Sequence, residues 1–505
     1  MDYNQNPILP NQLLVSTSDV LFGVRLTSYK FPYGTDIFGD LSLDHYDVSN
    51  GELLWSCELS GNIAASAATI EESGLVFITG KFIGEQLETC QGMTLTGGGG
   101  QFQVHHFLMA LNLNDGELLY LRNLSLTHLK ANAISSLAID PEGRLWYAVE
   151  EWGTAKIVRV NEAGVDQETR ILNGPRRIGT LSFDPWGGLY VSGATDEAEF
   201  SFAGQSFEIT QTTGYKMFVL RFNPDGTAGF AEFANDVTFQ NPTVIASDDG
   251  HAYLAENISL ETQWGDLTIQ GPEWVSTVFI SKLDSTGHFL WSVQGRSLPG
   301  GISGDVERSK GPCITIDDQG VLYFIANQRG LIDWGNDIVS GMDPITSRTI
   351  TILAISSEGI PIWSKSSLSN GFYNNAQTIT ASTNHESVHF AAQINSEFTF
   401  PPYSTNTTET QASIVGQIHT LPLSNSEIHL KNEMLIWPNP ASGSIYFMHE
   451  GNTQLKCKVW NSKGQMVKSI LLQPGLNHFN VEKLSSGLYF LQADNGQNET
   501  FLIRN

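Results

Sequence analysis

One hairpin pattern recurs along most of this chain. Its form is an apolar pair, a polar turn that ends in glycine, and a strand rich in apolar and aromatic residues. Well-formed copies occupy residues 139–147, 183–190 and 316–323, and looser copies occupy residues 70–77, 246–253, 381–390 and, without the glycine, 13–22. Such repetition constrains the fold strongly, because one repeat buries its apolar face only against its neighbours.

A second hairpin alternates with the first. An Asn or Asp precedes a turn glycine, which suits a type I turn followed by a residue at positive φ. The copies end at Gly51, Gly116, Gly164, Gly226, Gly287 and Gly359, and a degenerate copy without the turn spans residues 414–421. An aromatic residue follows four positions after all but one of these glycines, as Trp55, Tyr120, Phe230, Trp291 and Trp363. We expect these rings to be structural and to fill the space between neighbouring sheets.

Two hairpins per repeat predict a four-stranded blade, and about sixty residues per repeat is typical of a propeller blade with a long inner loop. The sequence therefore predicts an all-β chain with a seven-bladed β-propeller over residues 12–424 and a polar linker over residues 425–432. The inner loops contain Phe38-Gly39, Trp264-Gly265 and Trp334-Gly335. This pattern is similar to that of secreted bacterial β-propeller repeats.

Three short motifs follow the linker. Residues 435–440 read Leu-Ile-Trp-Pro-Asn-Pro, residues 459–465 read Val-Trp-Asn-Ser-Lys-Gly-Gln, and residues 484–491 read Leu-Ser-Ser-Gly-Leu-Tyr-Phe-Leu. Pro438 and Pro440 suit an edge strand, because proline has no backbone donor. Gly464 separates two short apolar stretches, as the turn of a hairpin would. Leu488, Phe490 and the alternating tail predict half-buried strands, so residues 433–505 read as a small β-sandwich.

These motifs, in this order and spacing, resemble the type A C-terminal sorting domain of the type IX secretion system of the Bacteroidota. The resemblance implies a small Ig-like β-sandwich over residues 433–505, with Pro438, Asn439, Pro440, Gly464, Gly487 and Tyr489 as its motif residues. It also implies the type IX machinery as partner, and export to the medium or to the outer surface of the outer membrane. Cleavage of this segment would then leave the propeller released or attached to surface lipopolysaccharide.

Charge and hydropathy limit the possible partners. Residues 433–505 contain six Lys or Arg and five Asp or Glu, a net charge of +1. Because the whole chain has a net charge of −26, residues 1–432 carry −27. So acidic a region argues against nucleic acid and anionic membrane surfaces as partners, because both bind through a basic surface. No apolar stretch is long enough to span a membrane. The first six residues do not form a signal peptide, so we expect the natural chain to start further upstream.

Four cysteines in so long a chain do not make a disulfide framework. We expect most of them to be small buried residues, and a bridge between Cys57 and Cys90 is the pairing to consider. No CxxC motif and no His/Cys cluster with zinc spacing occurs. We therefore predict no metal site.

Other candidate sites are better explained by local structure. The acids of the first hairpin turns could bind calcium, but Asp also caps its own turn, and no Asp-x-Asp-x-Asp loop occurs; these acids are Asp140, Asp184, Asp248, Asp249, Asp317 and Asp318. His105 and His106 would face opposite sides of a strand. Gly97 to Gly100 lack the lysine of a phosphate loop. Residues 47–55 look like a quinoprotein-type blade, which supports the fold but no cofactor.

Three functions compete. The first is a non-catalytic secreted or surface-attached propeller that binds a glycan or protein through its loops. The alternative is a polysaccharide hydrolase or lyase with paired carboxylates at the channel, for which Glu150, Glu151 and residues 196–199 supply acids. The third is a filament or adhesin component. No nucleophile elbow, sialidase box or zincin motif occurs, so we predict no catalytic residue and no cofactor.

Overall fold

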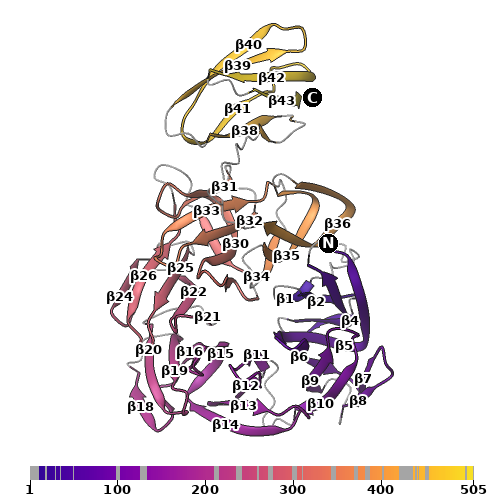
Figure 1. Ribbon diagram of the computed structural model, residues 1–505, viewed down its shortest axis with the longest axis vertical. Coiled ribbons are helices and arrows are strands. Elements are labelled where there is room, and N and C mark those ends of the chain that lie inside the picture. The colour runs from indigo at the N-terminus through magenta and orange to yellow at the C-terminus, as the bar shows by residue number, and fades with distance from the viewer. Residues whose placement is uncertain are drawn as a thin grey trace. The chain divides into compact units, whose positions relative to one another are not determined.

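The chain consists of β-strands and their connections (Figure 1), and no described residue lies in a helix. The computed structural model describes residues 11–16, 20–28, 30–33, 36–48, 51–97, 103–124, 134–209, 215–234, 242–258, 261–270, 277–297, 304–309, 311–342, 348–368, 374–381, 387–400, 403–419, 436–437, 441, 443–449, 454–494 and 498–503. Contacts divide the chain into two compact units, Met1–Leu421 and Pro422–Asn505. The finer boundaries at residues 12, 424 and 433 stay predictions.

Every copy of the first predicted hairpin is an antiparallel strand pair. The pairs are β1 (Asn11–Ser16) with β2 (Val20–Leu26), β5 (Leu53–Glu71) with β6 (Leu75–Ile83), β11 (Ile134–Ile139) with β12 (Leu145–Glu151), β15 (Pro175–Phe183) with β16 (Leu189–Thr195), β21 (Thr243–Ala246) with β22 (Ala252–Ile258), β29 (Ile314–Ile316) with β30 (Leu322–Asp333), and β34 (Asn375–Ala381) with β35 (Ser387–Phe400). The second strands are the most apolar, and β12, β16 and β22 are buried along their whole length.

The second predicted hairpin supplies the third and fourth strands. The third strands are β4 (Asp36–Asp47), β9 (Val104–Asn112), β13 (Thr154–Val160), β19 (Lys216–Phe222), β25 (Thr277–Leu283) and β32 (Thr349–Ile355). They pair in turn with β5, β10 (Leu118–Leu124), β14 (Asp166–Asn173), β20 (Ala228–Phe233), β26 (Phe289–Gln294) and β33 (Pro361–Ser366). In the last sheet β36 (Tyr403–His419) pairs with β35, and the degenerate copy adds no further described strand.

The sheets of the Met1–Leu421 unit follow one another around a ring in chain order (Figure 1). Their inner strands touch in a closed cycle, in which β1 contacts β5 and then β11, β15, β21, β29 and β34 follow, the last contacting β1 again. The two ends of the ring meet where Leu21 packs against Ala391 and the Gln417 side chain donates to the Val48 carbonyl at 3.1 Å. This unit is therefore a propeller-like ring of antiparallel sheets.

Short strands lie in the connections between the main strands, and some of them pair with the preceding sheet. These strands are β3 (Phe31–Tyr33), β7 (Gln86–Thr89), β8 (Thr94–Thr96), β17 (Glu199–Phe202), β18 (Gln205–Glu208), β23 (Glu261–Trp264), β24 (Leu267–Gln270), β27 (Arg296–Ser297), β28 (Asp305–Arg308) and β31 (Val339–Met342). For example, β17 continues the preceding sheet by pairing with β14, and β7 pairs with the part of β5 at Leu59 and Ser60. The loops thus cover edges that would otherwise be exposed.

The aromatic residues that follow the turn glycines lie between neighbouring repeats, as predicted. A Cβ atom added at Gly116, Gly164, Gly287 or Gly359 would lie 3.3, 2.9, 2.8 or 2.5 Å from the ring of Trp55, Tyr120, Phe230 or Trp291. Each ring therefore covers the turn glycine of the next repeat. Trp363 has no such partner turn, since the last copy has lost it, and its ring instead lies 6.0 Å from that of Tyr323.

The repeat that lacks the aromatic uses an arginine instead. Arg170 of β14 lies over the rings of Trp146 and Phe222, at 4.7 and 5.4 Å from their centroids. A Cβ atom added at Gly226, the turn glycine of the next repeat, would lie 3.8 Å from the Arg170 Nε. Stacked guanidinium therefore fills the same space as an aromatic ring.

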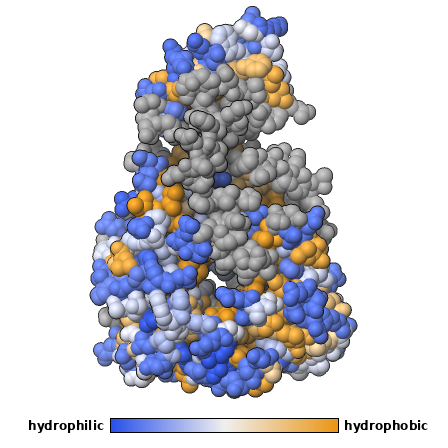
Figure 2. Space-filling model, viewed as in Figure 1, coloured by the Kyte–Doolittle hydropathy of each residue, from blue (hydrophilic) through white to orange (hydrophobic). Residues whose placement is uncertain are grey.

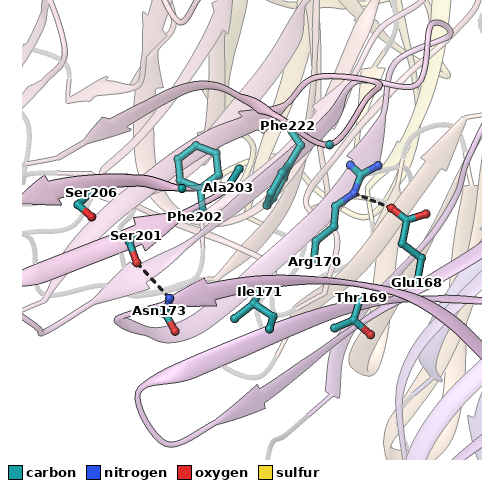
Figure 3. Close-up of a pocket in the computed structure, with 12 residues that line it drawn as sticks. Glu168, Thr169, Arg170, Ile171, Asn173, Ser201, Phe202, Ala203, Ser206 and Phe222 are labelled. Carbon is teal, nitrogen blue, oxygen red and sulfur yellow. Dashed lines mark hydrogen bonds and ion pairs between the residues drawn. The ribbon is translucent and has the colours of Figure 1, made fainter.

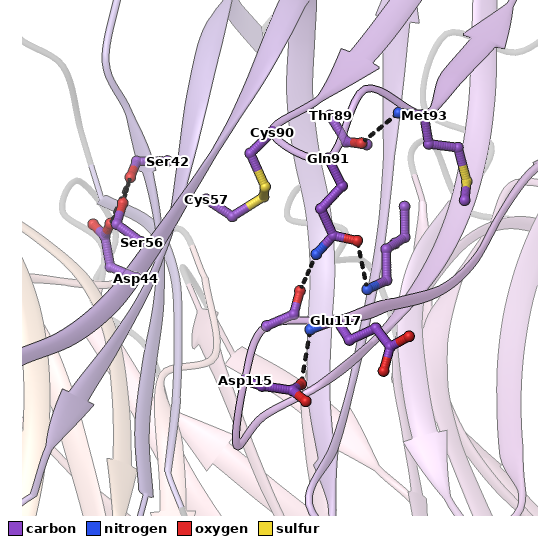
Figure 4. The surroundings of a disulfide bond; sticks show 12 residues. Ser42, Asp44, Ser56, Cys57, Thr89, Cys90, Gln91, Met93, Asp115 and Glu117 are labelled. Atoms are coloured by element: carbon purple, nitrogen blue, oxygen red, sulfur yellow. Dashed lines mark hydrogen bonds between the residues drawn. A yellow bond between two sulfur atoms is a disulfide. The ribbon is translucent and has the colours of Figure 1, made fainter.

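A disulfide joins the first two repeats (Figure 4). It links Cys57 of β5 to Cys90 after β7, with 5.4 Å between the Cα atoms. Next to it the Gln91 amide donates to the Gly116 carbonyl at 2.7 Å and accepts from the Leu118 backbone at 3.1 Å. Cys313 and Cys457 are buried and free, so the cysteine predictions are confirmed.

Removing this bridge should destabilise the protein. Replacing Cys57 and Cys90 with serine frees a loop of 33 residues in the unfolded chain, and we expect a loss of about 3 kcal/mol in the free energy of unfolding. Urea unfolding followed by tryptophan fluorescence measures it. The wild-type protein with dithiothreitol serves as the control and should unfold like the variant. An unchanged midpoint in both samples would contradict a structural role.

The described residues of the second unit form two sheets. One has β37 (Ile436–Trp437), β38 (Ser444–His449) and β41 (Gly475–Asn480), and the other has the order β40 (Met466–Leu472), β39 (Leu455–Asn461), β42 (Gly487–Ala493) and β43 (Asn498–Ile503). Residues of both sheets share one buried core, in which the rings of Phe447 and Phe479 stack at 5.3 Å. This unit is thus a small two-sheet β-structure.

Candidate functional site

The turn acids of the propeller-like unit are occupied by their own turns. One oxygen of each acid accepts the backbone N–H groups two and four residues later, which are those of Glu142 and Arg144 for Asp140, Trp186 and Gly188 for Asp184, and Gln319 and Val321 for Asp317. The other oxygen accepts from Trp146, Arg221 or Tyr323 at 2.8, 2.7 or 2.9 Å. The turn interpretation is confirmed for these three residues.

Asp249 is also engaged by its own turn, in which Ser247 holds the first position. Its carboxylate accepts from the His251 backbone and from the Lys282 ammonium, the latter at 2.7 Å. Burial alone would raise the pKa of Asp249, but the bonds from Lys282 and Ser247 outweigh it and hold the pKa well below its usual range. Asp248 and Asp318 are exposed. Within the described ranges, no three His, Cys, Asp or Glu side chains are grouped as a metal site would require.

Polar residues near the ends of the second strands join neighbouring sheets. Glu150, Asn257 and Asn327 occupy the same position of β12, β22 and β30. Their side-chain oxygens accept the backbone N–H groups of Ile178, Arg308 and Ala376 in the next sheet, at 2.8, 3.0 and 2.7 Å. Sequence reasoning missed this role, although polar residues at one register of otherwise apolar strands were a visible signal.

Three of the acids considered for a hydrolase, Glu150, Glu151 and Asp196, form ion pairs or hydrogen bonds. Glu150 accepts the Ile178 amide, and Glu151 pairs with Lys156 at 2.9 Å. Asp196 lies 3.7 Å from Arg176. The Arg176 guanidinium also lies 4.9 Å from the centroid of the Trp152 ring, which is 60% exposed. Each of these contacts has a structural explanation, and none of them pairs two carboxylates.

Glu232 of β20 has a raised pKa. Burial is the main cause, and the charge of Asp266 adds to it. Asp266 in turn lies 3.6 Å from His288. These residues belong to the outermost strand of their sheet and to its neighbouring loop, not to the inner strands of the ring. They therefore do not supply the pair of channel carboxylates that the hydrolase hypothesis requires.

His105 and His106 face opposite sides of β9, as predicted. His106 is 2% exposed, whereas the His105 ring lies 5.1 Å from that of Phe82 on the other face. Burial lowers the pKa of His105. Of the glycine run, Gly97 donates its backbone N–H to the Glu85 carbonyl at 2.7 Å, and Gly98, Gly99 and Gly100 lie outside the described residues.

A groove of about 660 Å³ lies where the β17–β18 hairpin continues the preceding sheet (Figure 3). The Asn173 amide donates to the Ser201 hydroxyl at 3.0 Å, and Arg170 contacts Glu168 at 3.4 Å. Ala203, in the turn of the hairpin, adopts a φ of +47°. The Asn173–Ser201 bond thus fastens the β17–β18 hairpin to β14. On the visible face in Figure 2, hydrophilic residues cover much of the propeller-like unit, with apolar residues between them.

The motif residues of the C-terminal unit hold its turns and core. Gly464 ends the β39–β40 turn at φ +71° and donates to the Asn461 carbonyl at 3.0 Å, as the hairpin prediction required. Tyr489 is 3% exposed, donates its hydroxyl to the Ser485 carbonyl at 2.8 Å and stacks on Phe501 at 5.6 Å. Gly487 begins β42 opposite Ile503.

Pro438, Asn439 and Pro440 lie outside the described residues, but the structure places the residues on either side of them. Trp437 pairs with Tyr446 of β38. Ala441 donates its N–H to the Leu502 carbonyl at 2.7 Å and forms a parallel bridge with Ile503. Trp437 and Ala441 thus lie against different sheets, Trp437 against β38 and Ala441 against β43.

The second and third motifs meet at one end of the β40–β39–β42–β43 sheet, beside Ala441, which follows the first motif. Asn461, at the start of the Gly464 turn, is opposite Tyr489, and Gly487 is opposite Ile503, which in turn bridges to Ala441. Residues far apart in the sequence thus share one corner of the unit.

Burial raises the pKa of the Cys457 thiol in the adjoining core to about 11, with the charge of Asp494 adding to it, so this cysteine is a packing residue.

This segment also matches a known family. Residues 435–503 match the model of the secretion system C-terminal sorting domain. The C-terminal unit is a type IX sorting domain. Recognition by the type IX machinery, and secretion or attachment to the outer membrane surface, follow from the sorting domain. Along the described strands and loops, no helix long and apolar enough to cross a membrane is found.

No curated protein matches the chain. Among solved structures, the Dos1 propeller is 8% identical and covers 82% of this chain and 94% of its own, with a TM-score of 0.39. A putative 6-phosphogluconolactonase from Bacteroides fragilis is 12% identical, with coverages of 79% and 98% and a TM-score of 0.37. PorZ of Porphyromonas gingivalis, a surface component of the type IX system, is 8% identical over 99% of both chains, with a TM-score of 0.17. At such low scores, the fold rests on the chain's own strand pairing.

Proposed function

We propose that this protein is a type IX cargo that displays a non-catalytic, seven-bladed β-propeller for binding. In this proposal residues 12–424 form the propeller, residues 425–432 the linker and residues 433–505 an Ig-like sorting sandwich. The observation that carries it is the match of residues 435–503 to the sorting family on a unit that is compact by itself. The closed cycle of inner strands and the paired hairpins support the blade count.

A binding role agrees with how the acidic residues are used. Asp140, Asp184 and Asp317 hold their own turns, and Glu150 holds the next sheet. Their carboxylates are therefore committed to the scaffold. In a propeller, the loops around such a scaffold are the variable parts available for recognition. A glycan or protein ligand on these loops fits this arrangement.

The disulfide also agrees with export. The Cys57–Cys90 bond forms and persists in oxidising surroundings such as the periplasm and the cell surface. Residues 1–432 carry a large negative charge, which favours the solubility of an exported protein. Both features suit a protein that works outside the cytoplasm.

Export can be tested directly. A signal peptide is fused to the full chain, and the fusion is expressed in a type IX-competent host with and without residues 433–505. We expect the full chain at the cell surface or in the medium, and the shortened chain in the periplasm. Mass spectrometry of the exported protein should find residues 433–505 removed. A host without type IX export is the control, and periplasmic retention of the full chain in the competent host would sink the proposal.

A further inference from the structure

The β40–β39–β42–β43 sheet has an outward face that departs from the usual pattern. The inward residues Val459, Tyr489 and Leu491 are at most 3% exposed. Between them, Leu488 and Phe490 point outward and are 43% and 40% exposed. An antiparallel sheet with one solvated face normally alternates apolar residues inside with polar residues outside. Folding alone therefore does not explain the outward Leu488 and Phe490.

Strand register brings further apolar residues beside them. Phe490 is opposite Trp460, which is itself opposite Met466, and Leu488 is opposite Leu502. Directly opposed side chains lie about 5 Å apart at Cβ. Met466 and Leu502 are 54% and 39% exposed, and Trp460 is half-buried. We call these residues, Trp460, Met466, Leu488, Phe490 and Leu502, the outer apolar face.

The rest of the same side is mostly polar and basic, apart from Leu471, which is 53% exposed. Lys458 is opposite Gln492 on β42 and Ser469 on β40, and Lys456 is opposite Leu471. The outer apolar face is thus bordered by two lysines. Acidic side chains on a partner would complement this border.

We propose that the outer apolar face is the surface by which the sorting domain docks onto a protein of the export machinery. This inference rests on the proposed export. The partner surface is apolar where it covers Phe490 and Leu488, and acidic where it meets Lys456 and Lys458. Contiguous exposed apolar residues mark interaction sites. The motif residue Tyr489 is buried directly behind this face, so it positions Leu488 and Phe490 without touching the partner.

The test changes the face and leaves the core intact. Leu488 and Phe490 are both replaced with threonine in the full chain behind a signal peptide, since threonine preserves strand propensity. We expect at least a tenfold fall in the fraction found in the medium or at the surface, with accumulation in the periplasm. Gln492→Thr, on the polar part of the same strand, should be exported like the wild type. Thermal unfolding of each purified variant verifies folding.

The outcomes separate the two proposals. If the wild-type chain stays periplasmic, both the proposed export and this inference fail. If the wild type and the folded double variant are both exported, the proposed export stands and only the inferred docking surface is wrong. A double variant that does not fold is replaced by Lys456→Glu with Lys458→Glu, for which export equal to the wild type overturns the proposal. A change from dimer to monomer with normal export assigns the face to a second copy instead.

Discussion

Replacing Trp291 with alanine is expected to lower the free energy of unfolding by about 3 to 5 kcal/mol. The ring covers Gly359 of the next repeat, and its Nε1 donates to the Ser357 carbonyl at 2.9 Å. It also lies 5.7 Å from the Tyr253 ring. Truncation would therefore open a cavity between neighbouring sheets and leave a carbonyl without its donor. Urea unfolding measures the loss.

Leu290 provides the matched control for this substitution. It is the preceding residue on β26 and is 50% exposed. Leu290→Ala should therefore change stability by less than about 0.5 kcal/mol. A similar loss for both variants would contradict the inter-sheet role of Trp291.

A double-mutant cycle identifies the contact itself. Gly359 adopts a φ of +83°, and an added Cβ would lie 2.5 Å from the Trp291 ring. Gly359→Ala alone should be destabilising for both reasons. In a Trp291→Ala background part of this cost disappears, because the ring is absent, so the two effects should not add. Strictly additive effects would show that the ring and the glycine do not interact.

Asp184→Ala is expected to cost a similar amount, about 3 to 5 kcal/mol. The carboxylate is 1% exposed, accepts two backbone N–H groups of its turn and binds Arg221 at 2.7 Å. Without it the Arg221 guanidinium, whose side chain is 11% exposed, keeps its charge but loses the buried counter-ion. Leaving an uncompensated buried charge is the main cause of the loss.

Asp225 is the control for Asp184. It also caps a turn, by accepting the Thr227 N–H at 3.0 Å, but it is exposed. Asp225→Ala should cost less than about 1 kcal/mol. Adding Arg221→Met to Asp184→Ala should recover part of the larger loss, since the orphaned charge is removed. No recovery in the double variant would argue against the buried pair, and equal losses for the two acids would argue against burial as the cause.

The repeats were predictable because turns are encoded locally. In each turn the glycine donates its backbone N–H to the carbonyl of a residue shortly before it, in many turns an Asn or Asp, as when Gly143 donates to the Asp140 carbonyl and Gly464 to the Asn461 carbonyl. Both partners lie within a few residues, so their spacing is visible in the sequence. The sorting motifs were recognisable for the same reason. The fold class and the C-terminal unit could therefore be inferred before the structure.

Contacts between repeats were only partly predictable. A recurring aromatic indicated packing between sheets, but the sequence did not show that Trp55 covers Gly116 or that Arg170 replaces the missing ring. Likewise Cys57 and Cys90 were one possible pair, and only their 5.4 Å separation between Cα atoms decides the bond. The role of Glu150, an acid considered for catalysis, also depended on a neighbour in the next sheet.

The sequence by itself determined the hairpins, their turn glycines, the all-β class and the sorting motifs, since each depends on hydrogen bonds or patterns within a short stretch of chain. Only the tertiary structure decided which face of β42 turns outward and which residues of other strands lie beside it. Either Leu488 and Phe490 or Tyr489 and Leu491 could have filled the core, because both sets alternate and both are apolar. Packing against Phe501 selected Tyr489, and that long-range choice left Leu488 and Phe490 exposed.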